Sequence, residues 1–310
     1  MLPLICVLLG VGLLILLTSY ICFRMAFLVV KRSNAEIPPG KEYEPYRPLL
    51  KKWMEEARQM PCEEMEITSF DGLKLRGKYY ECVPGAPMEI MFHGYRGNGE
   101  RDLCGGIQRA FALKRNVLIV DQRAGGRSEG NVITFGILES TDCVTWAEHV
   151  QQRFGEDVKV IITGVSMGAA TVMMAAAKPL PPCVVGVLAD CGYTSARDII
   201  KKVIRGMKLP ADLIYPVVRL GAILFGHFDP DAFSPEEAMK QCKLPVIFVH
   251  GEEDGFVPCE MTRKNCEVCT APKVLLTVPG ADHGLSYPAA PEVYVQTLND
   301  FNPVMGLPKV

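Results

Sequence analysis

Gly164-Val165-Ser166-Met167-Gly168 is the stretch that decides the fold. It follows a β-branched run, 158–163, and precedes a small, apolar run, 169–178, so we expect a strand, a sharp turn and a helix. A serine on such a turn is held with its hydroxyl above the end of the sheet, and the glycines keep the crossing chains apart. The stretch therefore predicts a nucleophile elbow with Ser166 as the nucleophile.

A serine hydroxyl needs a neighbouring base to accept its proton, and five histidines are available. His283 lies in a polar loop, 279–284, after an expected strand, 273–278. From such a loop a side chain can reach back over the carboxyl edge of the sheet, so we predict His283 as the base. The other histidines have plainer explanations on a helix face, in an irregular region or at strand ends: His149, His227, His93 and His250.

The base in turn needs a carboxylate that holds its tautomer and stabilises the imidazolium. Asp254 follows an expected strand, 245–249, and precedes Gly255, which suits a tight turn that presents the side chain. By composition and position the alternatives are Glu252, Glu253 and Asp190. With Asp254, the order along the chain is Ser, Asp, His, which differs from the two well-known protease orders.

Further motifs occur between these residues: Phe92-His93-Gly94-Tyr95-Arg96-Gly97-Asn98, Asp121 to Ser128, and Asp190 to Ser195. With them, residues 60–300 resemble an α/β-hydrolase of the serine aminopeptidase/lysophospholipase-like superfamily, similar to membrane-anchored bacterial hydrolases and to Bem46-like proteins. Ala124 departs from the family pattern, which has glycine there. The resemblance implies an α/β-hydrolase fold: a mostly parallel sheet of about eight strands flanked by helices, with a small helical lid.

The same resemblance implies which groups would hold an oxyanion. These are the backbone N–H groups of Tyr95, after the His-Gly pair, and of Met167, after the elbow serine. The assignment is physically sensible, because Gly94 permits a close approach of the chain and a helix N-terminus presents free N–H groups. We expect 121–128 to brace loops beneath the site rather than to bind substrate.

The remaining pattern alternates strands and helices. Strands at 63–68 and 73–80, joined by Asp71-Gly72, predict a hairpin. Later strands are expected to begin near 89, 116, 158, 184, 245 and 273, which makes 62–310 the catalytic domain. An extra stretch, 194–243, is long and apolar enough for helices at about 196–207, 212–224 and 235–241. We expect it to lie over the serine as a lid, either binding an acyl chain or simply packing on the core.

Residues 1–32 are predicted to be a single-pass transmembrane anchor. The run 2–23 is apolar, lacks the basic leader and cleavage site of a signal peptide, and is long enough to cross a hydrocarbon core. Arg24, Lys31 and Arg32 follow the span, which predicts a cytoplasmic catalytic domain. An apolar helix packed on the domain surface is the alternative. Residues 33–61 are predicted to be a proline-containing tether with a short helix near 49–59, whose apolar stripe docks on the domain.

Composition narrows the function classes. A net charge of -2 and the lack of basic-aromatic interleaving argue against nucleic-acid binding. Twelve cysteines show no disulfide spacing, and the Cys266, Cys269 pair has no histidine partner for zinc. We expect a serine hydrolase that cleaves a lipid-like or small acyl ester through Ser166, Asp254 and His283, with no cofactor or metal. A serine peptidase of the aminopeptidase kind, or a non-catalytic binding protein on this fold, is the alternative.

Overall fold

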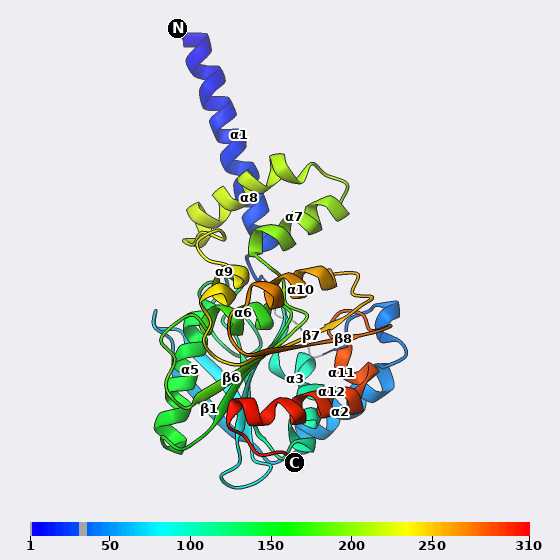
Figure 1. Ribbon diagram of the computed structural model, residues 1–310. Coiled ribbons are helices and arrows are strands. Elements are labelled where there is room, and N and C mark those ends of the chain that lie inside the picture. The colour runs from blue at the N-terminus through cyan, green and yellow to red at the C-terminus, as the bar shows by residue number, and fades with distance from the viewer. Residues whose placement is uncertain (1, 31–35) are drawn as a thin grey trace.

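One central sheet organises the molecule, which is described here from a computed structural model covering residues 2–30 and 36–310. Its eight strands lie in the order β1-β2-β4-β3-β5-β6-β7-β8, with helices on both faces (Figure 1). The strands are β1 Glu63–Thr68, β2 Lys74–Tyr80, β3 Met88–Phe92, β4 Asn116–Asp121, β5 Val160–Val165, β6 Val184–Asp190, β7 Val246–Gly251 and β8 Lys273–Val278. The β1–β2 and β2–β4 pairs are antiparallel, and the others are parallel. The predicted fold class is therefore confirmed.

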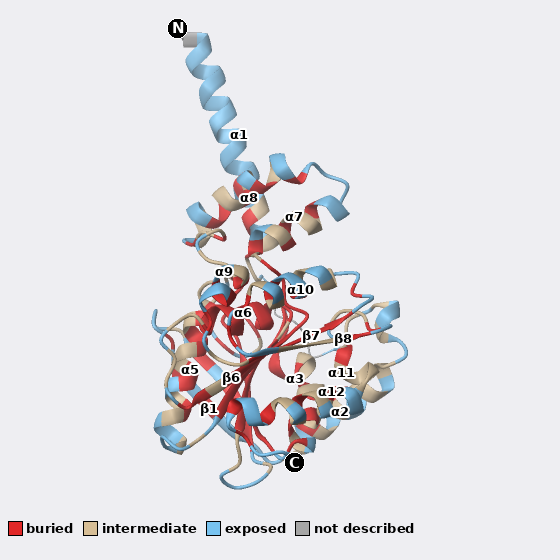
Figure 2. Cartoon of the chain, in the orientation of Figure 1, coloured by how far each residue is buried: buried red, intermediate tan, exposed pale blue. Residues whose placement is uncertain are grey.

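Helices cover this sheet and extend beyond it at one end. The described helices are α1 Leu2–Ala26, α2 Arg47–Gln59, α3 Gly99–Asp102, α4 Cys104–Ala112, α5 Glu139–Phe154, α6 Met167–Ala175, α7 Ala196–Gly206, α8 Ala211–Gly226, α9 Pro235–Gln241, α10 Cys259–Val268, α11 Ser286–Ala289 and α12 Pro291–Phe301, with 3-10 helices at Lys41–Tyr43 and Asn302–Met305. Strands β3 and β4 are buried at every position because helices lie on both faces of the sheet (Figure 2). Edge strand β1 instead alternates between exposed and buried residues toward its C-terminal end.

The hairpin predicted at Asp71-Gly72 is present. Thr68 pairs with Lys74 across it, and Gly72 has a φ of +92°, a conformation in which a side chain would be strained. Glycine at this turn therefore has a local physical reason.

Helix α1 projects away from the sheet in Figure 1. It contains one segment, Pro3–Ala26, that is long and apolar enough to cross a membrane. The last turns of α1 differ from the rest of the helix, since Ser19 and Phe23 are buried, as is Phe27 directly after the helix. A Cβ on Gly221 of α8 would lie 2.2 Å from the Ser19 carbonyl oxygen, so glycine there lets α1 and α8 approach closely. The surface-packing alternative thus describes the C-terminal end of α1, while the N-terminal turns stand exposed.

The predicted tether, 33–61, lies against the domain over its described part. Lys31, Arg32 and the predicted boundary after residue 32 fall outside the described residues. Helix α2 begins slightly before the predicted residue 49 and buries Met54, and its Trp53 ring lies 5.5 Å from that of Tyr287. The apolar stripe of α2 therefore docks on its own domain.

Residues 194–243 form the three helices that their pattern predicts, α7, α8 and α9. Their inner faces are buried, among them Ile200 and Ile204 of α7 and Tyr215 and Val218 of α8. Helix α8 packs along the C-terminal end of α1, and α7 packs on α8 (Figure 1). The insertion is thus a packed unit between α1 and the rest of the domain.

Candidate active site

Ser166 lies on the turn between β5 and α6, with φ 58° and ψ −117°. An L-residue rarely adopts this conformation, and such strain persists only when the surroundings enforce it. A Cβ on Gly164 would lie 2.1 Å from a backbone carbon of Gly168, and one on Gly168 would lie 2.0 Å from the Phe92 carbonyl oxygen. A side chain at either glycine of the elbow would therefore clash with neighbouring backbone atoms. The turn holds the serine side chain in one position.

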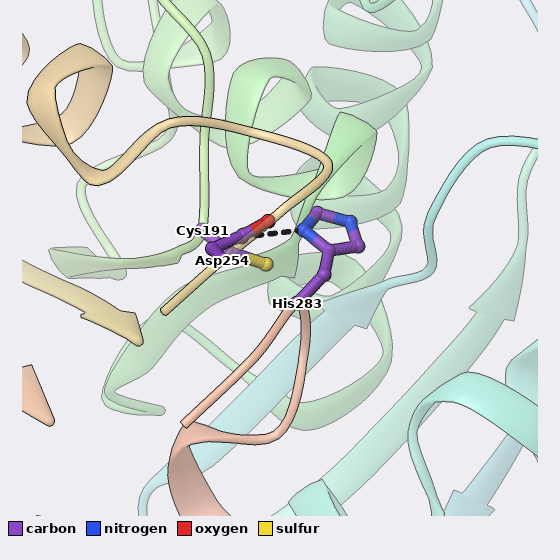
Figure 3. A group of neighbouring side chains, drawn as sticks. All are labelled: Cys191, Asp254 and His283. Carbon is purple, nitrogen blue, oxygen red and sulfur yellow. Dashed lines mark hydrogen bonds and ion pairs between the residues drawn. The ribbon is translucent and has the colours of Figure 1, made fainter. Parts of the chain in front are cut away.

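His283 lies on the loop after β8 and contacts Ser166, which is 117 residues earlier in the chain. Its Nε2 lies 2.9 Å from the Ser166 Oγ, and its Nδ1 lies 2.7 Å from Oδ2 of Asp254, a contact drawn in Figure 3. An ionised carboxylate only accepts, so Nδ1 carries the proton and Nε2 is free to accept from the serine hydroxyl. The structure thus brings the predicted nucleophile, base and acid into one hydrogen-bonded series.

Asp254 is buried and accepts hydrogen bonds with both carboxylate oxygens. Oδ1 accepts the N–H groups of Phe256 at 2.9 Å and Val257 at 2.7 Å, while Oδ2 faces His283 and His250. Burial alone raises the pKa of Asp254, but the hydrogen bonds from His250 and His283 outweigh it and hold the pKa well below the ordinary value. The carboxylate is therefore fixed in place and ionised.

His250 is a neighbour of this site that the sequence analysis placed only at the sheet edge. It is fully buried at the end of β7, and its Nδ1 lies 2.7 Å from Oγ1 of Thr262. Its Nε2 lies 3.1 Å from Oδ2 of Asp254 and 2.9 Å from the Val257 carbonyl oxygen, so this nitrogen carries a proton and donates. In the sequence, the available indication of this role was a histidine at a strand end, four residues before the predicted acid Asp254.

Two of the alternatives to Asp254, Asp190 and Glu252, are bonded elsewhere, and none of the hydrogen bonds of His283 within the described residues goes to Glu253. Asp190 accepts the hydroxyls of Ser286 at 3.2 Å and Tyr294 at 3.0 Å, and burial raises its pKa. Glu252 accepts the Thr277 hydroxyl at 2.7 Å. The carboxylate bonded to His283 is thus that of Asp254.

Of the predicted oxyanion donors, Met167 follows Ser166 directly and Tyr95 lines the same cavity as Ser166. Met167 is the first residue of α6, where the N–H has no partner in a preceding helical turn. A Cβ on Gly94 would lie 3.8 Å from the Ser166 Oγ, so the missing side chain leaves space beside the nucleophile. The Gly94 N–H is held by Oδ2 of Asp102 at 3.1 Å, which fixes the loop that carries Tyr95.

This loop is also fastened to α1, which the sequence did not indicate. The Tyr95 hydroxyl donates to the Ala26 carbonyl at 2.7 Å, and the Arg96 guanidinium donates to the Met25 carbonyl at 2.8 Å. These carbonyls belong to the C-terminal turn of α1, where no further helical N–H is available to them. The end of α1 and the candidate oxyanion loop therefore form one connected unit.

The remaining motif residues act as braces. His93 is buried, its Nε2 accepts the Gln122 N–H at 3.0 Å, and its Nδ1 lies 2.8 Å from the Gly94 carbonyl. Asp121 accepts the N–H groups of Gly99 and Arg127, both at 2.9 Å. Ala124 adopts a φ of +60°, a backbone conformation that favours glycine. The 121–128 turn thus joins loops beneath the site, as expected.

A cavity of about 250 Å³ opens beside Ser166 and His283. Apolar side chains from the N-terminal segment, the sheet and the loops line it: Ile37, Pro38, Leu50, Met91, Leu103, Val165, Phe256, Leu285, Tyr287 and Pro288. No residue of 194–243, a range that the structure describes completely, is among the lining residues. Residues 194–243 were expected to cover the cavity as a lid, but they pack beside α1. Residues of the predicted tether, 33–61, line the cavity instead.

Cys191 lies next to the candidate site (Figure 3). Possible ligand atoms of Cys191, Asp254 and His283 lie within 4.8 Å of one another, and within residues 2–30 and 36–310 this is the group that could hold a metal. Burial raises the pKa of the Cys191 thiol well above its ordinary value, and the other two side chains already bond each other. The Cys266, Cys269 pair does not belong to this group, and all twelve cysteines are free thiols.

Comparisons with known proteins agree with this architecture. No family model matches the chain. It is similar to an uncharacterized protein of Bacillus subtilis, YqkD, with 26% identity over 246 residues that cover 77% of this chain and 80% of YqkD. Bem46 of Schizosaccharomyces pombe is 26% identical over 206 residues, which cover 64% of this chain and 62% of Bem46. The structure of the Pyrococcus furiosus esterase Pf2001 matches with a TM-score of 0.64 and 23% identity, over 80% of this chain and 94% of the esterase.

Proposed function

We propose that this chain, an α/β-hydrolase similar to Bem46, is a membrane-anchored serine hydrolase that cleaves a carboxylic ester of a lipid-like or small acyl group. The observation that carries the proposal is the hydrogen-bonded series Ser166, His283 and Asp254 at the mouth of an apolar cavity. Pf2001, which shares the fold, is an esterase. The strained Ser166 backbone supports catalysis over passive binding, because strain of this kind clusters at reacting groups.

The proposed mechanism is an acyl transfer through an acyl-enzyme. His283 accepts the Ser166 proton as Oγ attacks the ester carbonyl carbon, and Asp254 stabilises the imidazolium. The N–H groups of Tyr95 and Met167 donate to the oxygen that becomes negative. His283 then gives its proton to the departing alkoxide, which leaves Oγ acylated. Water, deprotonated by His283, attacks the acyl group and restores the serine hydroxyl.

Peptide hydrolysis of the aminopeptidase kind is less well supported. It requires a carboxylate that is free to bind the substrate amine. Two carboxylates line the cavity, Asp102 and Asp190, and both already accept hydrogen bonds from protein donors. Asp102 also pairs with Arg101 at 2.6 Å. The apolar walls and the engaged carboxylates favour an uncharged acyl group.

Membrane attachment is assigned to α1. Its 24-residue segment Pro3–Ala26 meets the length that a hydrocarbon core of about 30 Å requires. Arg24, with Lys31 and Arg32 beyond the helix, favours a single span with the catalytic domain in the cytoplasm. Protease protection in inverted and right-side-out vesicles tests this orientation, and cleavage of the domain from the external side would contradict it.

Labelling by a fluorophosphonate probe tests the catalytic proposal. We expect the full chain in detergent to be labelled, and expect Ser166→Ala and His283→Ala to lose labelling while remaining folded. Esters of p-nitrophenol with increasing acyl length then report the size of the acyl site. Folded wild-type protein that is neither labelled nor active on any ester would refute the hydrolase and leave the non-catalytic binding protein.

A further inference from the structure

The outer face of α8 is apolar, unlike that of a helix exposed to water. Residues that share one side of the helix at a spacing of 3.6 are Leu213, Pro216, Val217, Leu220, Ile223 and Leu224. Leu213 is 75% exposed, and Ile223 and Leu224 are 40% and 44% exposed. We refer to these six residues as the α8 outer face. A surface helix normally presents polar side chains on this side.

The opposite side of α8 is apolar and covered. Tyr215, Val218 and Ala222 are buried, and the ring of Phe225 lies 6.0 Å from that of Phe23 on α1. Apart from Asp212, Tyr215 and Arg219, α8 is apolar, and a helix that is apolar on both sides is normally surrounded by protein or by lipid. Leu213, Pro216, Ile223 and Leu224 of the α8 outer face are exposed, whereas Val217 and Leu220 are half-buried. The contact between α8 and α1 indicates whether protein or lipid surrounds the exposed part of the α8 outer face.

The length of α1 places α8 at the depth of a membrane surface. The exposed part of the described span, from Pro3 to Thr18, has 16 residues, which rise about 24 Å at 1.5 Å per residue. A hydrocarbon core is about 30 Å thick, so these roughly 24 Å do not cross it completely, and a core that starts at Pro3 extends past Thr18. Directly beyond it, Ser19 lies against Gly221 of α8. The bilayer boundary therefore falls at the level where α8 packs on α1.

The charges next to this face fit an anionic lipid surface. Residues 196–231 contain six cationic side chains and four carboxylates, a net charge of +2. Arg197, Lys201, Arg205 and Arg219 form ion pairs with Asp212, Asp229 or Asp231. Arg205 and Lys208 lie exposed at the end of α7, next to Met207 and Leu209, which are 56% and 47% exposed in the α7–α8 turn. Cations next to exposed apolar side chains are the pattern of a helix that lies in the membrane interface.

We infer that the α7–α8 hairpin lies in the interfacial layer of a bilayer containing anionic lipid, with the α8 outer face against acyl chains and the α7 cations among the headgroups. The inference rests on the proposed anchoring by α1. It also gives a position to the active site, because the last turn of α1 is bonded to Tyr95 and Arg96. From Ser19 to Ala26 the helix rises about 10 Å, so the nucleophile lies close to the headgroups and the substrate is an ester that resides in the membrane.

Tryptophan fluorescence in vesicles tests the inference with the full chain. Leu213→Trp reports on the hairpin, Leu9→Trp on the exposed part of α1, and Val293→Trp on α12, far from α1 in Figure 1. All three leucine or valine side chains are more than half exposed, so the substitutions are tolerated equally. Wild-type protein, with Trp53 and Trp146, supplies the background. The vesicles contain phosphatidylcholine and phosphatidylglycerol, with or without brominated acyl chains.

We expect brominated lipid to quench the added tryptophans at 9 and 213 and to leave the one at 293 unchanged. Emission from position 213 should shift to shorter wavelength and lose about half its intensity, as for a ring about 5–10 Å below the headgroup boundary. Replacing phosphatidylglycerol by phosphatidylcholine should weaken that quenching. Quenching at 9 without quenching at 213 overturns the inference and leaves the anchor standing. Quenching at neither position refutes both, and ester hydrolysis in the same samples reports separately on catalysis.

Discussion

Replacement of Asp254 by asparagine tests the proposed acid, and the structure determines how the new amide must lie. Oδ1 accepts two backbone N–H groups, while Oδ2 faces His283 and His250. An amide NH2 group turned toward the backbone donors would leave buried donors unsatisfied, at about 1–3 kcal/mol each. The NH2 group therefore faces the histidines, which forces Nδ1 of His283 to accept and moves its proton to Nε2.

In that tautomer His283 cannot accept the Ser166 proton. We expect Asp254→Asn to lower kcat/KM by about 10⁴-fold, the size of effect known when an asparagine imposes the wrong histidine tautomer. The charge-assisted bond from His250 is also lost, so the free energy of unfolding should fall by about 2 kcal/mol. A typical domain has about 5–15 kcal/mol, so the variant should remain folded.

The same substitution should change the dependence of stability on acid. The pKa of Asp254 is lower in the folded chain than its unfolded value of about 3.9, so it contributes stability above that pH. This contribution is lost as the pH falls toward the folded-state pKa. Asp254→Asn lacks the titrating group, so its unfolding free energy should fall less steeply with acid than that of the wild type.

Initial rates with a p-nitrophenyl ester and thermal unfolding by circular dichroism measure both effects. Asp190→Asn is the matched control, because Asp190 is buried near the site and is bonded to Ser286 and Tyr294, not to His283. Its activity should change by less than about ten-fold. If Asp254→Asn kept activity within about ten-fold of the wild type, or if both variants were equally inactive, the tautomer argument would be refuted.

Three further predictions concern the elbow, the loop and the cavity. Gly168→Ala places a Cβ 2.0 Å from a backbone oxygen and should lower the free energy of unfolding by about 3 kcal/mol. Gly206→Ala, with open space around the new Cβ, is the control and should change this free energy little. Equal melting temperatures of the two variants would contradict the prediction. Tyr95→Phe keeps the backbone N–H but loses the 2.7 Å hydrogen bond to the Ala26 carbonyl. Loss of a hydrogen bond worth about 1 kcal/mol should lower kcat/KM about five-fold. Unchanged kinetics would disprove the coupling of α1 to the loop. Leu50→Ala enlarges the cavity and should move the p-nitrophenyl ester optimum to longer acyl groups, and an unmoved optimum would show that the N-terminal segment does not bound the acyl site.

Features encoded over a few neighbouring residues were predictable from the sequence. The elbow at Ser166 is a strand, a turn with glycines on both sides and a helix, all contiguous in the chain. The Asp71-Gly72 hairpin and the three helices of 194–243 have the same local origin. The proximity of Asp254 and His283 was predictable because parallel strands bring their carboxyl ends to one edge of the sheet.

Contacts between distant segments were decided only by the tertiary structure. His250 is the second donor to Asp254 because the loop after β7 folds back over the strand end. The Tyr95 hydroxyl bonds Ala26, 69 residues away, and Leu50 lines the cavity that the insertion was expected to cover. A side-chain pattern determines which face of an element is buried, but not which other element covers that face. That choice depends on the packing of all elements at once, so the sequence by itself determined the elbow and the order of the candidate residues, and packing determined their surroundings.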